Sequence, residues 1–351
     1  MFRKAPACRA PPRSSCVWPT AASCAGCSGC RSRASMPDLH RQNGIALITA
    51  ILLVSIATIT AVTLAARQQY DLRRSANLLD GDQAYAYSEG VETWARLILA
   101  RDAEDNQTDH LREVWATELA PVAVPGGQLN GRIRDAQGRF NLNNLINDAG
   151  TENPLALERY RRLLLLLQLP PELAESLLDW LDPDINLRLN GAEDNEYLLE
   201  DPPYRAANRR LNSPSELHYV KGYDAEAVRR LSPFVTALPQ TTALNVNTVV
   251  VPETEPRPFV LLQMLVEGMG ETEARQLVVG RGEDGYESVD AFAQEPALAG
   301  RDLQLDNLTV SSQFFLVEAE VDIGTARSRL FSLLRRDGQE LVTLQRTRGT
   351  R

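Results

Sequence analysis

Residues 44–66 of the chain read GIALITAILLVSIATITAVTLAA, a glycine followed by 22 residues without a charge or a proline. A bilayer core of roughly 30 Å is crossed by about 20 apolar residues in a helix. A single span must be helical, because every backbone amide in lipid needs a partner within its own segment. The stretch therefore predicts a membrane-spanning helix at residues 45–66.

The junction in front of this helix suggests how the N-terminus is processed. A short polar and basic run, His40-Arg41-Gln42-Asn43, ends at Gly44, and the apolar run begins at Ile45. A secretory signal peptide is instead cut after its apolar region, at small residues. Cleavage after Gly44 would keep the helix on the mature protein, with Ile45 as its first residue. The alternative is an ordinary uncut anchor.

This layout resembles the class III leader of type IV pilins and type II secretion pseudopilins. The resemblance implies that a prepilin peptidase cuts after Gly44 and that the new N-terminus is methylated. A start at Met36 would give a leader of nine residues, MPDLHRQNG. Within the leader, 1–44, we therefore expect residues 1–35 to be an upstream extension, the alternative being a genuine disordered arm.

Composition separates the leader from the rest of the chain. The 351 residues carry a net charge of −9, yet the first 44 are basic, and the remainder holds 30 basic against 45 acidic residues. Such an acidic body argues against nucleic acid as a partner. All five cysteines lie in the first thirty residues. Their spacing at Cys24, Cys27 and Cys30 suits an iron–sulfur or zinc site, but no fourth ligand stands nearby, so we expect none.

The body reads as strands on either side of a helical block. An apolar stripe at helical spacing continues the first helix to about Arg101. Residues 127–142 read as a hairpin with its turn at 135–138, and 310–346 alternate as strands. Helical patterns fill most of the region between. We therefore predict a sheet unit from 67–149 and 306–351, interrupted by a helical insertion at 150–305.

The insertion reads as two modules, about 150–240 and 241–305. The second opens on an N-x-N motif, Leu244-Asn-Val-Asn247, which echoes Phe140-Asn-Leu-Asn143 ahead of the first. The second resembles SAM-like or helix-hairpin-helix units, since Gly268-Met-Gly270 sits between two predicted helices. Glutamates surround that turn, where DNA-binding versions carry basic residues, so no DNA contact is expected.

Taken in order, several stretches resemble the K-type minor pseudopilin family of the type II secretion system. They are Gly44-IALITAILLV, Gly138-RFNLNNL, Trp180-LDPD, Gly191-AED, Pro202-PYRAANR, Ser215-EL and LNVNT. The resemblance implies an α+β fold: a long N-terminal transmembrane helix on a small antiparallel sheet, with a large all-helical SAM-like insertion.

The same resemblance implies a function. The protein would be a single-pass protein of the bacterial inner membrane with a periplasmic C-terminal body. It would stand at the tip of the pseudopilus, nucleating and capping the filament for export across the outer membrane. Its partners would be the I-, J- and H-type minor pseudopilins, through the N-terminal helices, the prepilin peptidase and the inner-membrane assembly platform.

Thr49 bears on the position at the tip. Pilin-like helices resemble one another in carrying glutamate at the fifth mature position, and Thr49 departs from that pattern in agreement with the K-type. A carboxylate in an apolar helix bundle is unfavourable unless it is paired. In a filament it can pair with the terminal amine of the subunit above, so a subunit without it needs no such neighbour. The alternative is that Thr49 is an ordinary residue of an unrelated anchor.

The irregular segment 181–212 carries a candidate calcium site. Asp182, Asp184, Asn186 and Glu193 stand at loop positions 1, 3, 5 and 12, an oxygen-rich spacing that suits calcium. Leu187 takes the place of the glycine that an EF-hand needs. The family resemblance also implies calcium in this region, and the alternative is a solvated acidic loop. The predicted ligands are Asp182, Asp184, Asn186, Glu193, Asp194 and Asp201.

The sequence offers no convincing catalytic group, and we predict that the protein is not an enzyme. Ser215, Glu216 and His218 invite a hydrolase interpretation, but they lie at a predicted helix start without a G-x-S-x-G elbow. Two other classes of function remain as alternatives. One is a single-span, membrane-anchored, calcium-dependent enzyme, and the other is a minor pilin of a type IV pilus or DNA-uptake system.

Overall fold

The computed structural model of the chain describes residues 45–118, 120–250 and 256–349. The chain divides into two compact units, one ending at Ala66 and the other beginning at Arg67. Helix α1 runs without interruption from Ile45 to Asp105. This confirms the predicted long N-terminal helix. The expected cleavage residue Gly44 lies outside the described residues.

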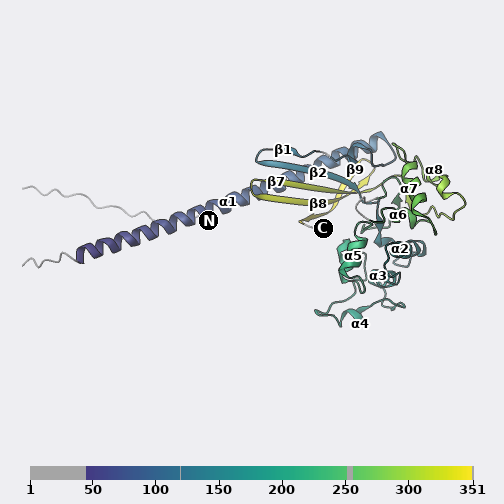
Figure 1. Ribbon diagram of the computed structural model, residues 1–351, viewed down its shortest axis with the longest axis horizontal. Coiled ribbons are helices and arrows are strands. Elements are labelled where there is room, and N and C mark those ends of the chain that lie inside the picture. The colour runs from purple at the N-terminus through teal and green to yellow at the C-terminus, as the bar shows by residue number, and fades with distance from the viewer. Residues whose placement is uncertain (1–44, 119, 251–255, 350–351) are drawn as a thin grey trace, which may run out of the picture. The chain divides into compact units, whose positions relative to one another are not determined.

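The second unit contains a five-stranded antiparallel sheet (Figure 1). Its order is β1-β2-β7-β8-β9, so strands from the two ends of the unit lie side by side at β2 and β7. The alternating sequence predicted the last three strands, and the glycines at their two turns, Gly324 and Gly338, have positive φ. The strands are β1 (Val122–Val124), β2 (Gly127–Asp135), β7 (Phe314–Ile323), β8 (Ala326–Asp337) and β9 (Glu340–Arg348).

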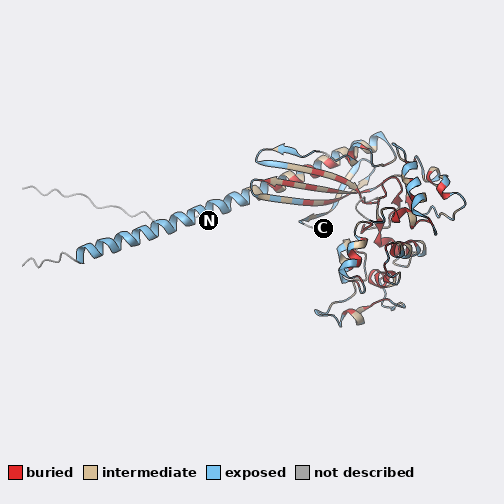
Figure 2. Cartoon of the chain, viewed as in Figure 1, coloured by how far each residue is buried: buried red, intermediate tan, exposed pale blue. Residues whose placement is uncertain are grey.

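The second half of α1 packs on one face of this sheet (Figure 2). Val91, Ala95 and Leu99 are buried against apolar residues of β2, β7 and β8. A Cβ on Gly131 of β2 would lie 2.7 Å from the Val91 side chain, so the glycine allows the helix to approach closely. The amphipathic stripe predicted for this half of the helix is buried at Val91, whereas Tyr70 and Leu78 are exposed.

A large insertion separates β2 from β7 and has its own continuous apolar core. The chain leaves the sheet after Asp135 and returns at Phe314, so this segment extends past the predicted 150–305 at both ends. Its helices are α2 (Pro154–Leu166), α3 (Leu173–Leu181), α4 (Asp194–Tyr197), α5 (Ala225–Leu231), α6 (Val260–Gln263), α7 (Glu271–Gly280) and α8 (Val289–Ala293). Three short 3-10 helices also belong to the insertion, at Leu142–Leu145, Pro214–Tyr219 and Pro296–Leu298, and a fourth, Val114–Ala116, precedes β1.

Two predictions about the insertion were wrong. Residues 127–142 do not form a hairpin: β3 (Phe140–Asn141) pairs in parallel with β4 (Val235–Thr236). The insertion is also not all-helical, because β5 (Leu244–Asn245) pairs in parallel with β6 (Leu308–Thr309). Both N-x-N motifs thus begin at a short strand of this kind. The backbone N–H of Gln137 donates to Asp135 Oδ1, which turns the chain away from β2.

Candidate metal centre

Three acidic side chains converge where α3 ends and α4 begins. Asp179 lies on α3, Asp182 directly follows the last residue of α3, and Glu193 precedes the first residue of α4. Asp179 is fully buried, and Asp182 and Glu193 are each 5% exposed. The fold therefore withdraws three carboxyl groups from water in one small region of the insertion.

The three groups act on one another electrostatically. Burial raises the pKa of Glu193 to about 7, and the nearby Asp179 and Asp182 add to the shift. Burial likewise raises the pKa of Asp182 to about 6, with Asp184 and Asp179 contributing. The pKa of Asp179 is also raised by burial, against backbone N–H groups and the Arg188 guanidinium, which lower it. When several carboxyl groups with raised pKa values lie close together, a cation bound between them stabilises their charged forms.

Oxygen atoms of the cluster have no hydrogen-bond partner among the described residues. They are Asp179 Oδ1, Asp182 Oδ1 and both carboxylate oxygens of Glu193. Arg188 is the cation beside them, with its Nε 3.5 Å from Asp179 Oδ1 and 3.8 Å from Asp182 Oδ2. One guanidinium that also pairs with Glu152 leaves the cluster short of positive charge. Buried carboxylates without partners are strongly unfavourable, and hard oxygen donors suit Ca²⁺, so the group fits this ion.

The predicted ligands fall into two sets. Asp182 and Glu193 are buried in the cluster. The charge of Asp184 helps to raise the pKa of both. The Asp184 side chain itself is exposed and accepts a hydrogen bond from the Asn186 N–H. Asp194 accepts a hydrogen bond from Ala206 N–H at 3.0 Å and pairs with Arg205.

Asp201 and Asn186 are exposed at the surface of the loop, where no ion pair joins Asp201 to another described residue. The sequence interpretation missed Asp179. Its separation of three residues from Asp182 at the end of an apolar helix is the signal that would have found it. Calcium binding by these residues stays a prediction.

A second acidic cluster lies outside the insertion. Ligand oxygens of Asp102, Asp109 and Glu113 lie within 4.8 Å of one another. Arg336 of β8 joins two of these acids, donating to Asp102 Oδ2 at 3.0 Å and forming an ion pair with Asp109. Glu113 accepts from the indole of Trp115. The arrangement ties the end of α1 to β8 with a side chain instead of an ion.

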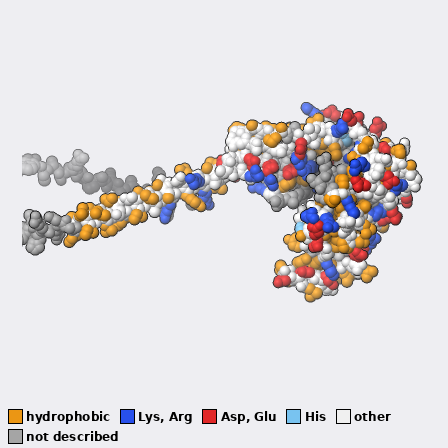
Figure 3. Space-filling model, viewed as in Figure 1, with side chains coloured by type: hydrophobic (Ala, Val, Ile, Leu, Met, Phe, Trp, Pro, Cys, Tyr) orange, Lys and Arg blue, Asp and Glu red, His pale blue; other side chains and the backbone are white. Residues whose placement is uncertain are grey.

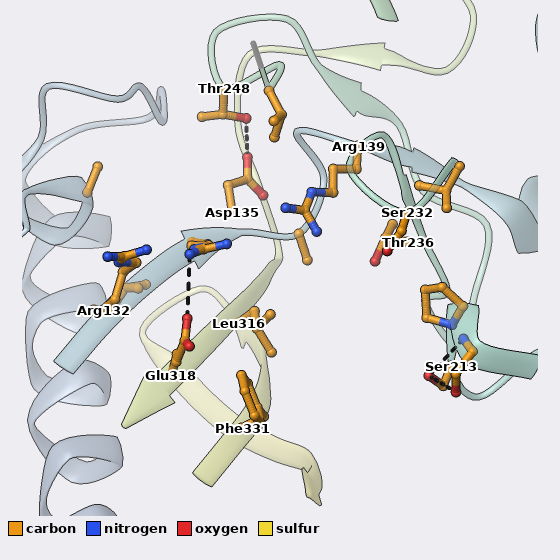
Figure 4. Close-up of a pocket in the computed structure, with 18 of the residues that line it drawn as sticks. Arg132, Asp135, Arg139, Ser213, Ser232, Thr236, Thr248, Leu316, Glu318 and Phe331 are labelled. Carbon is orange, nitrogen blue, oxygen red and sulfur yellow. Dashed lines mark hydrogen bonds and ion pairs between the residues drawn. The ribbon is translucent and has the colours of Figure 1, made fainter. Parts of the chain in front are cut away.

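A cavity of about 680 Å³ lies between the sheet and the insertion (Figure 4). Leu316 and Phe331 of the sheet line it on one side, and Ser232 and Thr236 line it from the insertion. It also contains the Ser215 and His218 considered above as a hydrolase pair. Ser213 caps the start of a short helix here, as the sequence predicted. Ser215 Oγ lies 2.9 Å from Ser213 Oγ and makes no hydrogen bond to His218.

The apolar half of α1 is long enough and apolar enough to cross a membrane. Its exposed aliphatic side chains are visible along the helix in Figure 3. Thr49 Oγ1 donates back to the carbonyl oxygens of Ile45 and Ala46, at 3.1 and 3.0 Å. The hydroxyl is therefore satisfied within its own helix, and Thr49 presents no charge to a neighbouring helix. These properties are those of a membrane-anchored protein.

Comparison with known proteins identifies the family. Two adjacent regions, residues 138–240 and 244–311, match the family described as type II secretion system (T2SS), protein K. The chain is 40% identical over 307 residues to the type II secretion system protein K of Pseudomonas aeruginosa, covering 84% of this chain and 89% of that protein. It is 37% identical over 324 residues to the Klebsiella pneumoniae protein of the same name, covering 88% of this chain and 97% of that protein.

A solved structure gives the same result. The GspK-GspI-GspJ complex of the enterotoxigenic Escherichia coli type 2 secretion system contains a chain that is 31% identical, with a TM-score of 0.71. The match covers 79% of this chain and all of the solved one. The chain described here therefore belongs to the protein K family of the type II secretion system.

Proposed function

We propose that the chain is the minor pseudopilin at the tip of the type II secretion pseudopilus, where it nucleates the filament and caps it for protein export across the outer membrane. It acts without catalysis, as a structural subunit. Its body lies in the periplasm and α1 holds it in the inner membrane. The second module of its insertion is SAM-like, as the resemblance implies.

One observation carries the position at the tip. The whole segment between Asp135 and Phe314 is inserted between β2 and β7, in the middle of the sheet. In a thin filament each subunit must fit beneath the next one, and a head of this size fits only where nothing lies above it. Thr49 supports the same position, because it removes the carboxylate that would pair with the amine of a subunit above.

The partners follow from the relatives. The solved neighbour is a complex of GspK, GspI and GspJ, and this chain is expected to assemble with its own I- and J-type subunits. The H-type subunit and the inner-membrane assembly platform complete the proposal. The prepilin peptidase would act earlier, cutting after Gly44 so that Ile45 carries the methylated amine.

Calcium is proposed as the bound ion. Asp179, Asp182 and Glu193 would supply the buried oxygens, and Asp184 the exposed one. Asn186, Asp194 and Asp201 complete the set expected from the sequence. The ion would neutralise the crowded carboxylates and hold the loop between α3 and α4 in one conformation. Its role is structural, in keeping with a non-catalytic subunit.

Assembly tests the function directly. The body from Arg67 onward is a compact unit, and it should form a stoichiometric complex when mixed with the bodies of its I- and J-type partners. Analytical ultracentrifugation should show one species with one copy of each chain. A body that stays monomeric in this mixture, while the I- and J-type bodies bind each other, would count against the proposal.

A further inference from the structure

We infer that residues 67–76 of α1, the neck, bind the phosphate headgroups of anionic phospholipids in the membrane that α1 spans. The neck reads Arg67-Gln-Gln-Tyr-Asp-Leu-Arg-Arg-Ser-Ala76. It begins directly after the last residue of the apolar run, and three of its four charged residues are arginines. The inference rests on α1 as the membrane anchor and is independent of where the subunit stands in the filament.

The neck is exposed on all sides. Every residue from 67 to 79 is exposed (Figure 2). Among the described residues, hydrogen bonding between α1 and the sheet begins at Asn77, whose side chain accepts from Thr325 Oγ1 at 3.0 Å. Tyr70 is 75% exposed and Leu72 71%. The sequence placed Tyr70 in the stripe that packs on the sheet, so the exposure of this large aromatic side chain calls for another explanation.

The positive charge of the neck is unpaired. The guanidinium groups of Arg67, Arg73 and Arg74 form no hydrogen bond or ion pair with a described residue. Asp71 is the single acid of the neck, and no ion pair joins it to these arginines. Figure 3 shows blue side chains where the apolar stretch of α1 gives way to the body. The neck therefore holds free positive charge next to an acidic body.

The geometry of a helix directs these side chains toward the bilayer. Cα–Cβ bonds in an α-helix tilt toward its N-terminus, and the N-terminal part of α1 is the membrane-spanning segment. The headgroup region is about 5–7 Å deep on each side of the hydrocarbon core. At about 1.5 Å per residue, Arg67 lies at its inner edge and Arg74 roughly 10 Å further along. Long Arg side chains that lean back can place their charged ends at the phosphates.

Charge selects the ligand. Anionic lipid surfaces attract basic segments beside a membrane-spanning helix, and guanidinium groups form paired hydrogen bonds to phosphate oxygens. Tyr70 lies at the level where tyrosine is enriched in membrane proteins. In the orientation proposed above, the arginines lie on the periplasmic side, whereas Lys and Arg normally concentrate on the cytoplasmic side. They therefore do not serve as the usual topology signal, and bound phosphates would fix the depth of α1 in the membrane.

Photo-crosslinking in vesicles tests the inference with the full chain. A photoreactive residue replaces Tyr70, and the protein is reconstituted in equal parts of phosphatidylglycerol and phosphatidylcholine. Mass spectrometry of the lipid adducts should show phosphatidylglycerol in about fivefold excess, the factor expected for one arginine at an anionic surface. Arg67→Gln/Arg73→Gln/Arg74→Gln should make the two adducts equal. No lipid adduct, equal adducts in the parent protein, or an unchanged excess in the triple variant would overturn the inference.

Two controls separate the neck from the rest of the protein. Leu97 lies on the same helix, is 68% exposed and is roughly 46 Å from Ala66 along the helix axis, so a photoreactive residue there should give no lipid adduct. Arg112→Gln/Arg229→Gln/Arg275→Gln removes the same charge from side chains that are 62%, 68% and 63% exposed. This variant should keep the phosphatidylglycerol excess at position 70. The vesicles contain no other pseudopilin, so the result does not depend on the proposed position at the tip.

The same photoreactive residue in secreting cells distinguishes lipid from a protein partner. Position 70 should give phospholipid adducts there as well. Adducts with protein alone would assign the neck to a neighbouring helix and overturn the inference.

Discussion

Glu92 of α1 is 2% exposed and accepts two hydrogen bonds from the guanidinium of Arg346 on β9, at 2.7 and 2.9 Å. The pair joins the helix to the last strand of the sheet. Burial alone would raise the pKa of Glu92, but hydrogen bonds from Arg346, Thr343 and Ser332 outweigh it and lower the pKa to about 2. The last strand is therefore held by a charge on the helix as well as by its pairing with β8.

Replacing this charge should loosen the contact between helix and sheet. We expect Glu92→Gln to lower the free energy of unfolding by about 2 kcal/mol, since hydrogen bonds to a buried charged group are lost. Because the folded pKa is depressed, this stabilisation is present above about pH 4.5 and is lost as the pH falls through 2. Urea unfolding of the body from Arg67 measures it. Glu89→Gln, three residues earlier on the same helix and half-exposed, is the matched control and should change little.

The second acidic cluster gives the opposite pH dependence. Burial, with Glu113 and Asp109 adding to it, raises the pKa of Asp102 from 3.8 to about 7 against the lowering effect of Arg336. The folded protein thus holds a proton that the unfolded chain releases. This contribution to stability is fully present below about pH 3.8 and is lost as the pH rises through 7.

Asp102→Asn should therefore flatten the fall in stability between pH 3.8 and about pH 7, the interval between the unfolded and folded pKa values of Asp102. Asp105→Asn, on an exposed position of the same helix, serves as the control. Unfolding curves collected across this range for both variants make the comparison. An equally steep fall in the Asp102→Asn protein would mean that another group is responsible.

Calcium should stabilise the body. When free calcium is a hundredfold above its dissociation constant, the expected gain is about 2.7 kcal/mol. Chelation should remove the gain, and so should Asp182→Ala/Asp184→Ala or Asp179→Asn, because each takes oxygen ligands from the buried cluster. Asp148→Asn, an exposed acid paired with Arg210, should keep the response. Identical melting with chelator and with millimolar calcium would leave a solvated acidic loop without an ion.

The processing of the N-terminus can be read from the mature protein. We expect the membrane form to begin at Ile45 with a methylated amine. Gly44→Val should leave the precursor uncut and block secretion, since a branched side chain would not fit the peptidase. Mass spectrometry of the purified N-terminal peptide distinguishes the cleaved, methylated form from the uncut precursor. Residues 1–44 still attached in a secreting cell would contradict the pseudopilin layout.

Local sequence patterns were enough to predict many elements of the fold. The uncharged run from Ile45 and the alternation in β7, β8 and β9 each specify their element without help from the rest of the chain. The pairing of β3 with β4 was missed because it joins Phe140 to Val235 through strands of only two residues. Strands that short leave no periodic signal, and their register depends on contacts far along the chain.

In the candidate sites, too, residues set by local chain spacing were predicted and residues brought together by long-range contacts were not. Asp182 and Glu193 were predicted from loop spacing, which reflects local chain geometry. Asp179 was missed because it lies inside the apolar pattern of α3, where a buried acid looks like an ordinary helix residue. Arg336 and Asp109 lie 227 residues apart, so only the folded structure brings that cluster together.

The position of the chain in the filament is the central claim, and labelling of intact pseudopili tests it most directly. The body after Cys30 lacks cysteine, so one cysteine introduced at the exposed position Val279 allows a single gold label per mature subunit. Electron microscopy should then show label at one end of each filament and none along the shaft. Label spaced regularly along the shaft would contradict the tip assignment.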